Sequence, residues 1–425
     1  MNPAAALADH LQLAVSKQPT SLALRHAGQT WTFSEWQAEV QALVATRPTT
    51  PGPMVLAGNS LELARHAYAC SFQNRPFFPV DRSTSAHHLA HRKTPPLSDV
   101  ALIISTSGSE GQARGILLGN AQLDAAAAAS NQRLPLRPGD LWLNCLPLYH
   151  IGGQSILWRC ARAGAAVLLH DGFAAEHVAA DLASHPVTHI SLVPAMLARL
   201  LDIGAMPPPS LRIAMIGGAA LSQTLYQRAI AVGWPLYPSY GMSETAAQIA
   251  TFDPADGQWT EGRVGLPMPG HELRIDPDGR ICIRGPQVMA GYLEGGGPSA
   301  EGWLTTSDFG QLDERGHLSI LGRADDMLVS GGRNVHPQEI ESCLAACPGV
   351  QDVAVTGRPD PVWGDLIVAF IVGDAQPEAL LAHARQHLPA AALPRKIQAV
   401  SQLPRNAGGK LERALLRRLA AESAP

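Results

Sequence analysis

The most informative stretch of this chain is residues 105–115, which read Ser-Thr-Ser-Gly-Ser-Glu-Gly-Gln-Ala-Arg-Gly. The apolar runs Val100–Ile104 and Ile116–Leu118 flank it and predict two buried strands. Glycines let the backbone approach a ligand closely and turn successive N–H groups toward it, while hydroxyls and one guanidinium add donors. We interpret the stretch as a loop that cradles a polyphosphate, with an ordinary surface turn as the alternative.

This loop differs from the familiar glycine-rich phosphate motifs. The P-loop of nucleoside triphosphatases needs Gly-Lys-Ser/Thr after four spacer residues, and counting from Gly108 places Ala113 and Arg114 there instead. A strand, rather than a helix, is expected to follow the loop, and the three spaced glycines of the dinucleotide-binding fingerprint are missing. The sequence therefore excludes both motifs.

Strand-like runs alternate with helical patterns on the C-terminal side of the loop. The strands are expected at Leu141–Cys145, Ala166–Leu169, His189–Val193 and Arg212–Ile216. This alternation predicts a layered α/β domain with largely parallel sheets. Short strands punctuated by Gly and Pro after Asp253 predict a β-rich subdomain, and the chain after Arg323 predicts a small α+β domain. We expect a large domain over residues 1–323 and a small one over residues 324–425.

Composition excludes several classes of protein. The chain has 425 residues, 46% apolar and 16% charged, which is enough to bury a large core. The formal net charge is −4 and no basic block stands out, so no nucleic-acid partner is expected. No apolar run approaches the roughly 20 residues of a membrane helix, and no signal-peptide pattern is visible. We expect a cytoplasmic protein without a membrane span.

Six scattered cysteines are interpreted as small buried residues of a reducing compartment. Cys343 and Cys347 are the closest pair, and their spacing predicts one shared helix face. No second pair near them in the sequence completes a zinc site.

An ordered series of motifs resembles the adenylate-forming superfamily of acyl-CoA synthetases and adenylation domains. The motifs are Thr106–Gly115, Leu146–Gly152, Ile216–Ala219, Tyr240–Thr245, Gly302–Asp308, Gly322–Glu341 and Pro404–Lys410. One motif alone would be weak support, but the complete series in this order indicates the family.

The resemblance implies ATP, Mg²⁺ and coenzyme A as ligands, and it implies a role for each matching residue. The phosphate loop corresponds to Thr106, Ser107, Gly108, Ser109, Gly111 and Arg114. The turn beside the adenine and the acid corresponds to Gly217, Gly218 and Ala219. The adenine-stacking segment corresponds to Tyr240, Gly241 and Met242. The magnesium ligand corresponds to Glu244, the α-phosphate contact to Thr245, and the ribose contacts to Asp308 and Arg323.

The same resemblance implies a mobile C-terminal domain. Lys410 corresponds to the lysine required for adenylation, and Asp325 to the hinge. Gly331 and Gly332 correspond to the thiol tunnel, and Trp363 resembles a position that stacks on the adenine of CoA in some aryl-CoA ligases. His150 corresponds to a residue that lines and gates the acyl pocket, with a purely structural histidine as the alternative.

The chemistry agrees with these implied roles. A carboxylate attacks the α-phosphorus of ATP, and the charge that builds on the phosphoryl oxygens needs a cation such as Lys410 and a metal held by Glu244. A carboxylate oxygen is a ligand that suits magnesium. In a second step a thiol attacks the acyl adenylate, so the lysine can leave and the small domain can rotate.

The phosphate loop departs from the family pattern at three positions. Glu110 replaces a hydroxyl residue, Ala113 a proline, and Arg114 a lysine whose charge it keeps. A carboxylate that faced the triphosphate would repel it, so a catalytically weak homologue is one alternative. The chain is also short for the family, with few residues between Pro79-Val80-Asp81 and the loop.

The motif around His150 resembles the o-succinylbenzoate–CoA ligase branch, and Ser330–Pro337 resembles that branch and benzoate-type CoA ligases. An aromatic or cyclic carboxylic acid is therefore the expected substrate class. The expected acid pocket consists of His150, Ile151, Met215, Ile216 and Met242. A stand-alone adenylation enzyme that loads an acyl carrier protein is the other alternative.

Overall fold

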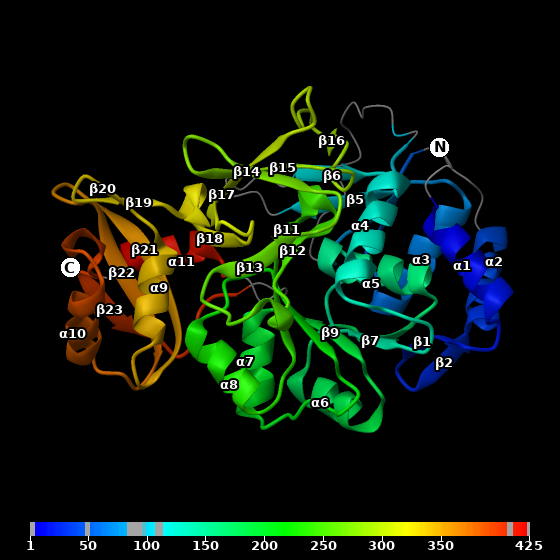
Figure 1. Cartoon of the computed structure of the whole chain (residues 1–425), viewed down its shortest axis with the longest axis horizontal. Helices are drawn as coiled ribbons and strands as arrows, with labels where there is room; N and C mark the ends of the chain where they lie inside the picture. The colour runs from blue at the N-terminus through cyan, green and yellow to red at the C-terminus, as the bar shows by residue number, and fades with distance from the viewer. Residues whose placement is uncertain are drawn as a thin grey trace.

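The computed structural model describes residues 5–46, 52–82, 97, 99–106, 114–405 and 411–422, which form a large and a small part (Figure 1). Several residues predicted for the site lie outside these ranges: Ser107, Gly108, Ser109, Glu110, Gly111, Ala113 and Lys410.

A parallel sheet forms the centre of the large part. Its strands are β1 (Leu22–His26), β8 (Ala166–Leu169), β7 (Leu141–Asn144), β9 (His189–Leu192), β10 (Ile213–Ile216) and β11 (Leu236–Met242), with β2 (Gln29–Thr32) antiparallel at the edge. Strands β7 to β10 are buried along their whole length, as expected when both faces of a parallel sheet are covered. The predicted alternation of parallel strands and helices is confirmed.

Strand β11 is the point at which the sheet changes direction. It pairs parallel with β10 and antiparallel with β12 (Ala247–Thr251). The hydrogen-bonded path continues through β13 (Arg263–Pro267), β18 (Leu318–Arg323), β17 (Leu304–Leu312), β15 (Arg280–Arg284) and β14 (Glu272–Ile275). The antiparallel strands expected after Asp253 are therefore present, and within the described ranges they extend the parallel sheet.

A second sheet carries the predicted phosphate loop. Its strands are β16 (Gly291–Tyr292), β6 (Arg114–Leu118), β5 (Leu102–Thr106), β4 (Phe77–Pro79) and β3 (Met54–Leu56). Strands β5 and β6 pair antiparallel, with Thr106 opposite Arg114 at the end where residues 107–113 connect them. The prediction of a strand after the loop is confirmed.

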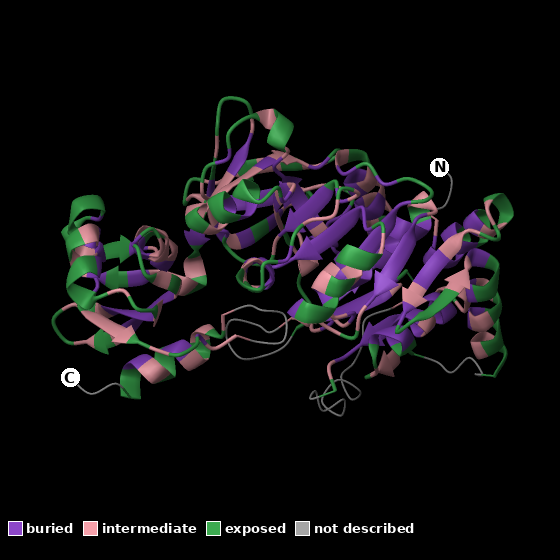
Figure 2. Cartoon of the chain, turned by 90° about the horizontal axis from the view of Figure 1, so that it is seen from below, coloured by how far each residue is buried: buried purple, intermediate pink, exposed green. Residues whose placement is uncertain are grey.

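Helices cover both faces of the parallel sheet, so the buried residues concentrate in the strands and on the inner helix faces (Figure 2). They are α1 (Leu7–Lys17), α2 (Phe33–Thr46), α3 (Ser60–Phe72), α4 (Asn120–Arg133), α5 (Ile151–Ala163), α6 (Ala175–Ser184), α7 (Pro194–Asp202) and α8 (Gln223–Ala231). Helices α1 to α5 share one core with both sheets, and α6 to α8 pack on the opposite face of the parallel sheet. No helix in the described ranges has the length and apolar content to cross a bilayer.

The small part has its own sheet and its own cores. Its strands are β19 (Leu328–Ser330), β20 (Arg333–Val335), β21 (Val350–Asp360), β22 (Gly364–Gly373) and β23 (Lys396–Ala399). Its helices are α9 (Pro337–Ala345), α10 (Pro377–His387) and α11 (Arg413–Glu422). Short 3₁₀ turns occur in the large part, as η2 (Ser243–Thr245) and η3 (Pro254–Asp256), at the junction, as η4 (Ala324–Asp326), and in the small part, as η5 (Ala390–Ala392).

The prediction that Cys343 and Cys347 share a helix face is wrong. Helix α9 ends at Ala345, so Cys347 lies beyond it. Cys347 precedes Pro348, whose ring disfavours helical backbone at the residue before it.

The two parts touch near η4. The ring of His336 packs against Phe309 at 5.3 Å between centroids, the Thr224 hydroxyl donates to the Ala345 carbonyl at 3.3 Å, and the Ser342 hydroxyl donates to Glu261. The separate cores support a domain boundary near residue 324, which stays a prediction, as does the hinge role of Asp325.

Two glycines allow a direct test of the strand packing. Gly265 and Gly139 have nearly equal positive φ angles of +82° and +86°, but a Cβ on Gly265 would lie 2.4 Å from the Thr251 carbonyl oxygen, whereas a Cβ on Gly139 meets nothing within 4 Å. Gly139→Ala should cost about 1–2 kcal/mol through its backbone conformation. Gly265→Ala should cost about 1–3 kcal/mol more through overpacking. Urea unfolding followed by tryptophan fluorescence measures both, and equal losses would contradict the packing argument.

Candidate active site

The predicted nucleotide residues gather where the sheet changes direction. Gly217, Gly218 and Ala219 follow the carboxyl end of β10, Tyr240 to Met242 end the neighbouring β11, and η2 carries Glu244 and Thr245. Ligands bind open α/β sheets in the crevice outside the carboxyl ends of the parallel strands. The fold therefore brings these sequence-predicted residues to one place.

Two glycines at this place are required by close contacts. A Cβ on Gly241 would lie 1.7 Å from the Ala247 carbonyl oxygen, which no side chain could tolerate. A Cβ on Gly217 would lie 2.8 Å from the Ser239 hydroxyl, and Gly218 has a φ of +79°, which favours glycine. These glycines hold the turns that present backbone groups to the site.

A buried carboxylate connects three strands at the edge of the site. Asp308 on β17 is 4% exposed. The Tyr240 hydroxyl donates to its Oδ2 at 2.5 Å, and the Arg323 guanidinium forms an ion pair with its Oδ1 at 3.1 Å. Burial and the charge of Asp308 raise the pKa of Tyr240 well above its usual value, so the phenol stays protonated and remains the donor. The sequence-predicted adenine and ribose residues are thus in direct contact.

Arg323 extends this contact to the junction with the small part. Burial opposes its charge, but the carboxylates of Asp308 and Asp325 outweigh that effect and raise the pKa of Arg323. Its guanidinium also contacts Asp325 at 3.1 Å, and Arg417 donates to the Asp325 carbonyl at 2.8 Å. The predicted ribose contact and the predicted hinge residue therefore belong to one chain of polar contacts.

Glu244 is held by a residue that sequence reasoning missed. The Tyr292 hydroxyl on β16 donates to Oε1 of Glu244 at 3.2 Å, and the guanidinium of Arg114 lies 3.3 Å from the Tyr292 ring centroid. Burial and Glu244 raise the pKa of Tyr292 to about 12, so it donates at neutral pH. Glu244 is only half-buried, and its carboxylate oxygens are the hard donors that Mg²⁺ prefers. The site thus fits a magnesium ion.

Thr245 and His150 contact neighbouring protein groups in the described structure. The Thr245 side chain is fully buried, and its hydroxyl donates to the Met242 carbonyl at 3.1 Å, so a contact with the α-phosphate requires it to change partner. His150 is the N-cap residue of α5, half-buried against Tyr149 at 4.7 Å between ring centroids. The roles of both residues remain predictions.

The residues predicted to contact CoA lie together in the small part. The Gly331 N–H donates to the Trp363 carbonyl at 2.9 Å, and a Cβ on Gly331 would lie 3.3 Å from the Trp363 ring. Gly331 and Gly332 form the turn between β19 and β20 with φ angles of +57° and +73°. The Arg395 guanidinium lies 4.1 Å from the Trp363 ring centroid.

A buried arginine in contact with Met215, one of the residues expected to line the acid pocket, was also missed. Arg159 on α5 is 1% exposed, and its guanidinium lies near the Met215 sulfur at 3.9 Å and the Trp142 ring at 5.4 Å. Its Nε has no hydrogen-bond partner, and no carboxylate pairs with it, among the residues that the structure describes. Burial lowers the pKa of Arg159 to about 10, so it remains a cation at neutral pH. In the sequence, the signal that could have identified Arg159 is that it is the single charged residue within the otherwise apolar run Ile156–Cys160.

The family model described as AMP-binding enzyme matches residues 90–293, and that of the AMP-binding enzyme C-terminal domain matches residues 339–410. A 2-succinylbenzoate–CoA ligase of Bacillus cereus (strain Q1) is 37% identical over 344 residues, which cover 77% of this chain and 71% of that protein.

The chain belongs to the AMP-binding enzyme family. A 2-succinylbenzoate–CoA ligase of Bacillus pumilus is 38% identical over 75% of this chain and 68% of that protein. The o-succinylbenzoate CoA synthetase (MenE) of Bacillus subtilis, solved with the acyl-adenylate OSB-AMP, superposes with a TM-score of 0.85 at 28% identity, covering 98% of each chain. ATP-bound MatB of Rhodopseudomonas palustris has a TM-score of 0.88 at 24% identity, covering 98% of this chain and 99% of that one, and supports the fold alone.

Asp308 offers the sharpest test of this AMP-binding site. Asp308→Asn removes the charge that faces Arg323, and hydrogen bonds to charged groups contribute about 1.5–3 kcal/mol. We expect the Kd for ATP, measured by calorimetry, to rise roughly ten- to a hundredfold. Asp202→Asn breaks an exposed pair with Arg228 at 2.8 Å and serves as the control. Equal affinities in the two variants would contradict the assignment of Asp308.

Proposed function

We propose that the protein is an ATP-dependent acid–CoA ligase that forms AMP and pyrophosphate. The observation that carries this proposal is the contact of Tyr240, Asp308 and Arg323 at the switch in the sheet, beside Glu244. It occurs in a member of the AMP-binding enzyme family whose curated relatives are named 2-succinylbenzoate–CoA ligases.

The first step of the proposed reaction activates the acid. A carboxylate oxygen attacks the α-phosphorus of ATP, the bond to the β-phosphate oxygen breaks, and pyrophosphate leaves. Asp308 and Arg323 would hold the ribose, and Tyr240 would stack on the adenine. Glu244 would hold Mg²⁺, which when bound neutralises charge on the phosphate oxygens. Lys410 would supply the second cation at the developing charge.

The second step of the proposed reaction transfers the acyl group. The sulfur of CoA attacks the acyl carbonyl, the bond to AMP breaks, and the thiol proton passes to solvent. Gly331, Gly332 and Trp363 would line the path of the thiol. Their contact within the small part supports this role, because the turn between β19 and β20, which carries both glycines, is hydrogen-bonded to Trp363 in the turn between β21 and β22.

The proposed substrate is an aromatic acid with a second anionic group. A buried guanidinium without a carboxylate partner is costly, because desolvation penalises an unpaired charge. Arg159 lies against Met215, one of the residues expected to line the acid pocket, so a substrate anion could complete the pair. The 2-succinylbenzoate named for the relatives carries two carboxylates, of which one would be activated and the other would face Arg159.

CoA is the proposed acceptor, and an acyl carrier protein is the alternative that the assay below separates. A cytoplasmic location is supported by the six cysteines, all of which lie in the described ranges, form no disulfide and, apart from Cys343, are buried.

A pyrophosphate-release assay tests the proposed reaction. The protein is incubated with ATP, magnesium and a panel of aryl and alkyl acids, with and without CoA, and both pyrophosphate and thioester are measured. Thioester that requires CoA supports the ligase. Adenylate that accumulates without thioester indicates carrier loading, and no pyrophosphate with any acid indicates a binding homologue.

Lys410→Ala separates the two steps. We expect it to abolish pyrophosphate release but to leave thioester formation from synthetic acyl adenylate within about threefold of the unmodified protein, because the ammonium stabilises only the first transition state. Lys396→Ala, on β23 of the small part, is the control. Equal loss of both steps would contradict the role of Lys410.

Arg159→Met tests the substrate class. Methionine fills a similar volume without charge, so the KM for an aromatic acid with two carboxylates should rise roughly ten- to a hundredfold. The KM for the matching acid with one carboxylate should change less than about twofold. Arg162→Met, three residues along α5 and paired with Asp124, is the control. Equal effects on both acids would show that Arg159 acts through packing alone.

A further inference from the structure

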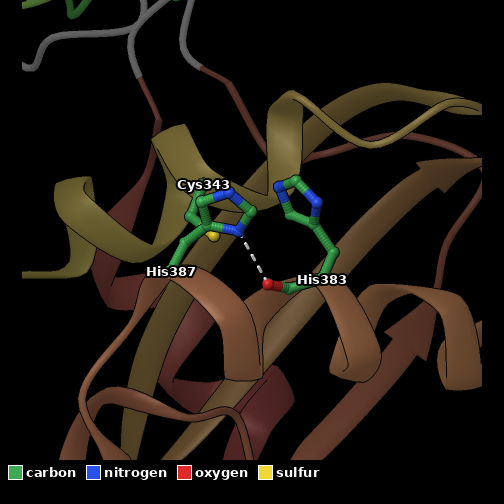
Figure 3. A group of neighbouring side chains, drawn as sticks. All are labelled: Cys343, His383 and His387. Carbon is green, nitrogen blue, oxygen red and sulfur yellow. Dashed lines mark hydrogen bonds between the residues drawn. The ribbon is translucent and has the colours of Figure 1, made fainter.

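Three potential metal ligands converge between two helices of the small part. Cys343 comes from α9, and His383 and His387 come from α10. The thiol sulfur and one nitrogen of each imidazole lie within 4.8 Å of one another. In Figure 3 the sulfur lies beside the ring of His387, and the ring of His383 faces the same space. None of these residues belongs to the AMP-binding site.

The two histidines have the spacing of a chelating pair. Residues four apart lie on one face of a helix, and paired histidines at this spacing bind zinc in other proteins. Their ring centroids are 4.3 Å apart. The Nδ1 of His387 donates to the carbonyl of His383 at 2.9 Å. Because a carbonyl only accepts, this contact fixes the Nδ1–H tautomer and leaves Nε2 with a lone pair for a metal.

Cys343 is the only cysteine that is not buried. Its side chain is half-buried, as is that of His383, whereas His387 is exposed. An ion could therefore enter from solvent without unfolding either helix. The exposed side of the cluster also leaves room for a water molecule as a fourth ligand.

We propose that Cys343, His383 and His387 form a binding site for a borderline-soft divalent metal ion of the Zn²⁺ type. One thiolate and two imidazoles select zinc or cobalt over magnesium or calcium, which prefer oxygen. Tetrahedral zinc holds sulfur at about 2.3 Å and nitrogen at about 2.0 Å, so its ligand atoms lie roughly 3.3–3.6 Å apart. Side-chain rotations that move the ligand atoms by about 1 Å would bring them from the observed separation, within 4.8 Å, to these distances. This proposal is independent of the proposed ligase activity.

Such an ion would connect α9 to α10. Ser342 and Ala345, the neighbours of Cys343 on α9, contact the large part through Glu261 and Thr224. The metal would therefore fix the helix that faces the large part to the core of the small part. A ligand that binds only the folded state raises stability, so the thermal midpoint should rise with metal concentration.

Cobalt spectroscopy of the full-length protein tests the site. The protein is prepared without a histidine tag, reduced, and titrated with Co²⁺. We expect one Co²⁺ per chain, with visible bands of tetrahedral cobalt and a near-ultraviolet thiolate-to-cobalt band. Cys343→Ser should abolish the thiolate band. His383→Gln and His387→Gln should each weaken binding at least tenfold, and Zn²⁺ should displace the cobalt.

Matched variants separate this site from other thiols and imidazoles. Cys347→Ser removes the neighbouring buried cysteine, and His177→Gln removes an exposed histidine on α6, so neither should change the titration. Circular dichroism checks that each variant is folded. In the unmodified protein, Zn²⁺ should also slow alkylation of Cys343 by iodoacetamide, read by mass spectrometry. Absence of the thiolate band, its persistence in Cys343→Ser, or unprotected alkylation would overturn the proposal.

Discussion

The buried charge of Asp308 is the constraint on which the rest of the site depends. A carboxylate that is 4% exposed is tolerated only when it is paired and hydrogen-bonded. Its partners come from β11 and β18, so the antiparallel strands must keep their register for the charge to be satisfied. Arg323, the cationic partner, also contacts Asp325 at the junction with the small part. One electrostatic requirement therefore links the nucleotide site to the junction about which the small part is proposed to turn.

The change of strand direction at β11 places the remaining groups around that charge. The turn after β10 and the end of β11 lie side by side because these strands are parallel, while the return strand β12 runs so close that only glycine fits at position 241. Glu244 lies on η2, directly after β11, and its carboxylate accepts a hydrogen bond from Tyr292 of the second sheet. The two sheets thus contribute charges of opposite sign to one site: the carboxylate of Asp308 comes from the first sheet and the guanidinium of Arg114 from the second.

Much of this arrangement could be predicted from the sequence, because its signals are local. The parallel strands are short apolar runs and each motif is a short continuous segment, so the sequence predicts both, while the roles of the motif residues come from the family resemblance. Strand β16 has only two residues and no periodicity, so neither it nor the contact of Tyr292 with Glu244 could be predicted. The cluster of Cys343, His383 and His387 was missed for a similar reason. Its members lie about 40 residues apart on two helices, and only tertiary packing brings them together.

Arg159 shows how an unsatisfied group in the free protein can serve specificity. Its guanidinium is desolvated beside Trp142 and Met215, and in the described part of the chain no carboxylate pairs with it, so burial of this cation carries a free-energy penalty. In the proposed function, an acid with a second anion would relieve that penalty on binding, whereas an acid without one would leave it in place. Sites built to pair a polar substrate group reject analogues that lack it, because the buried partner is then left unpaired. The cost in stability and the proposed selectivity therefore have one physical origin.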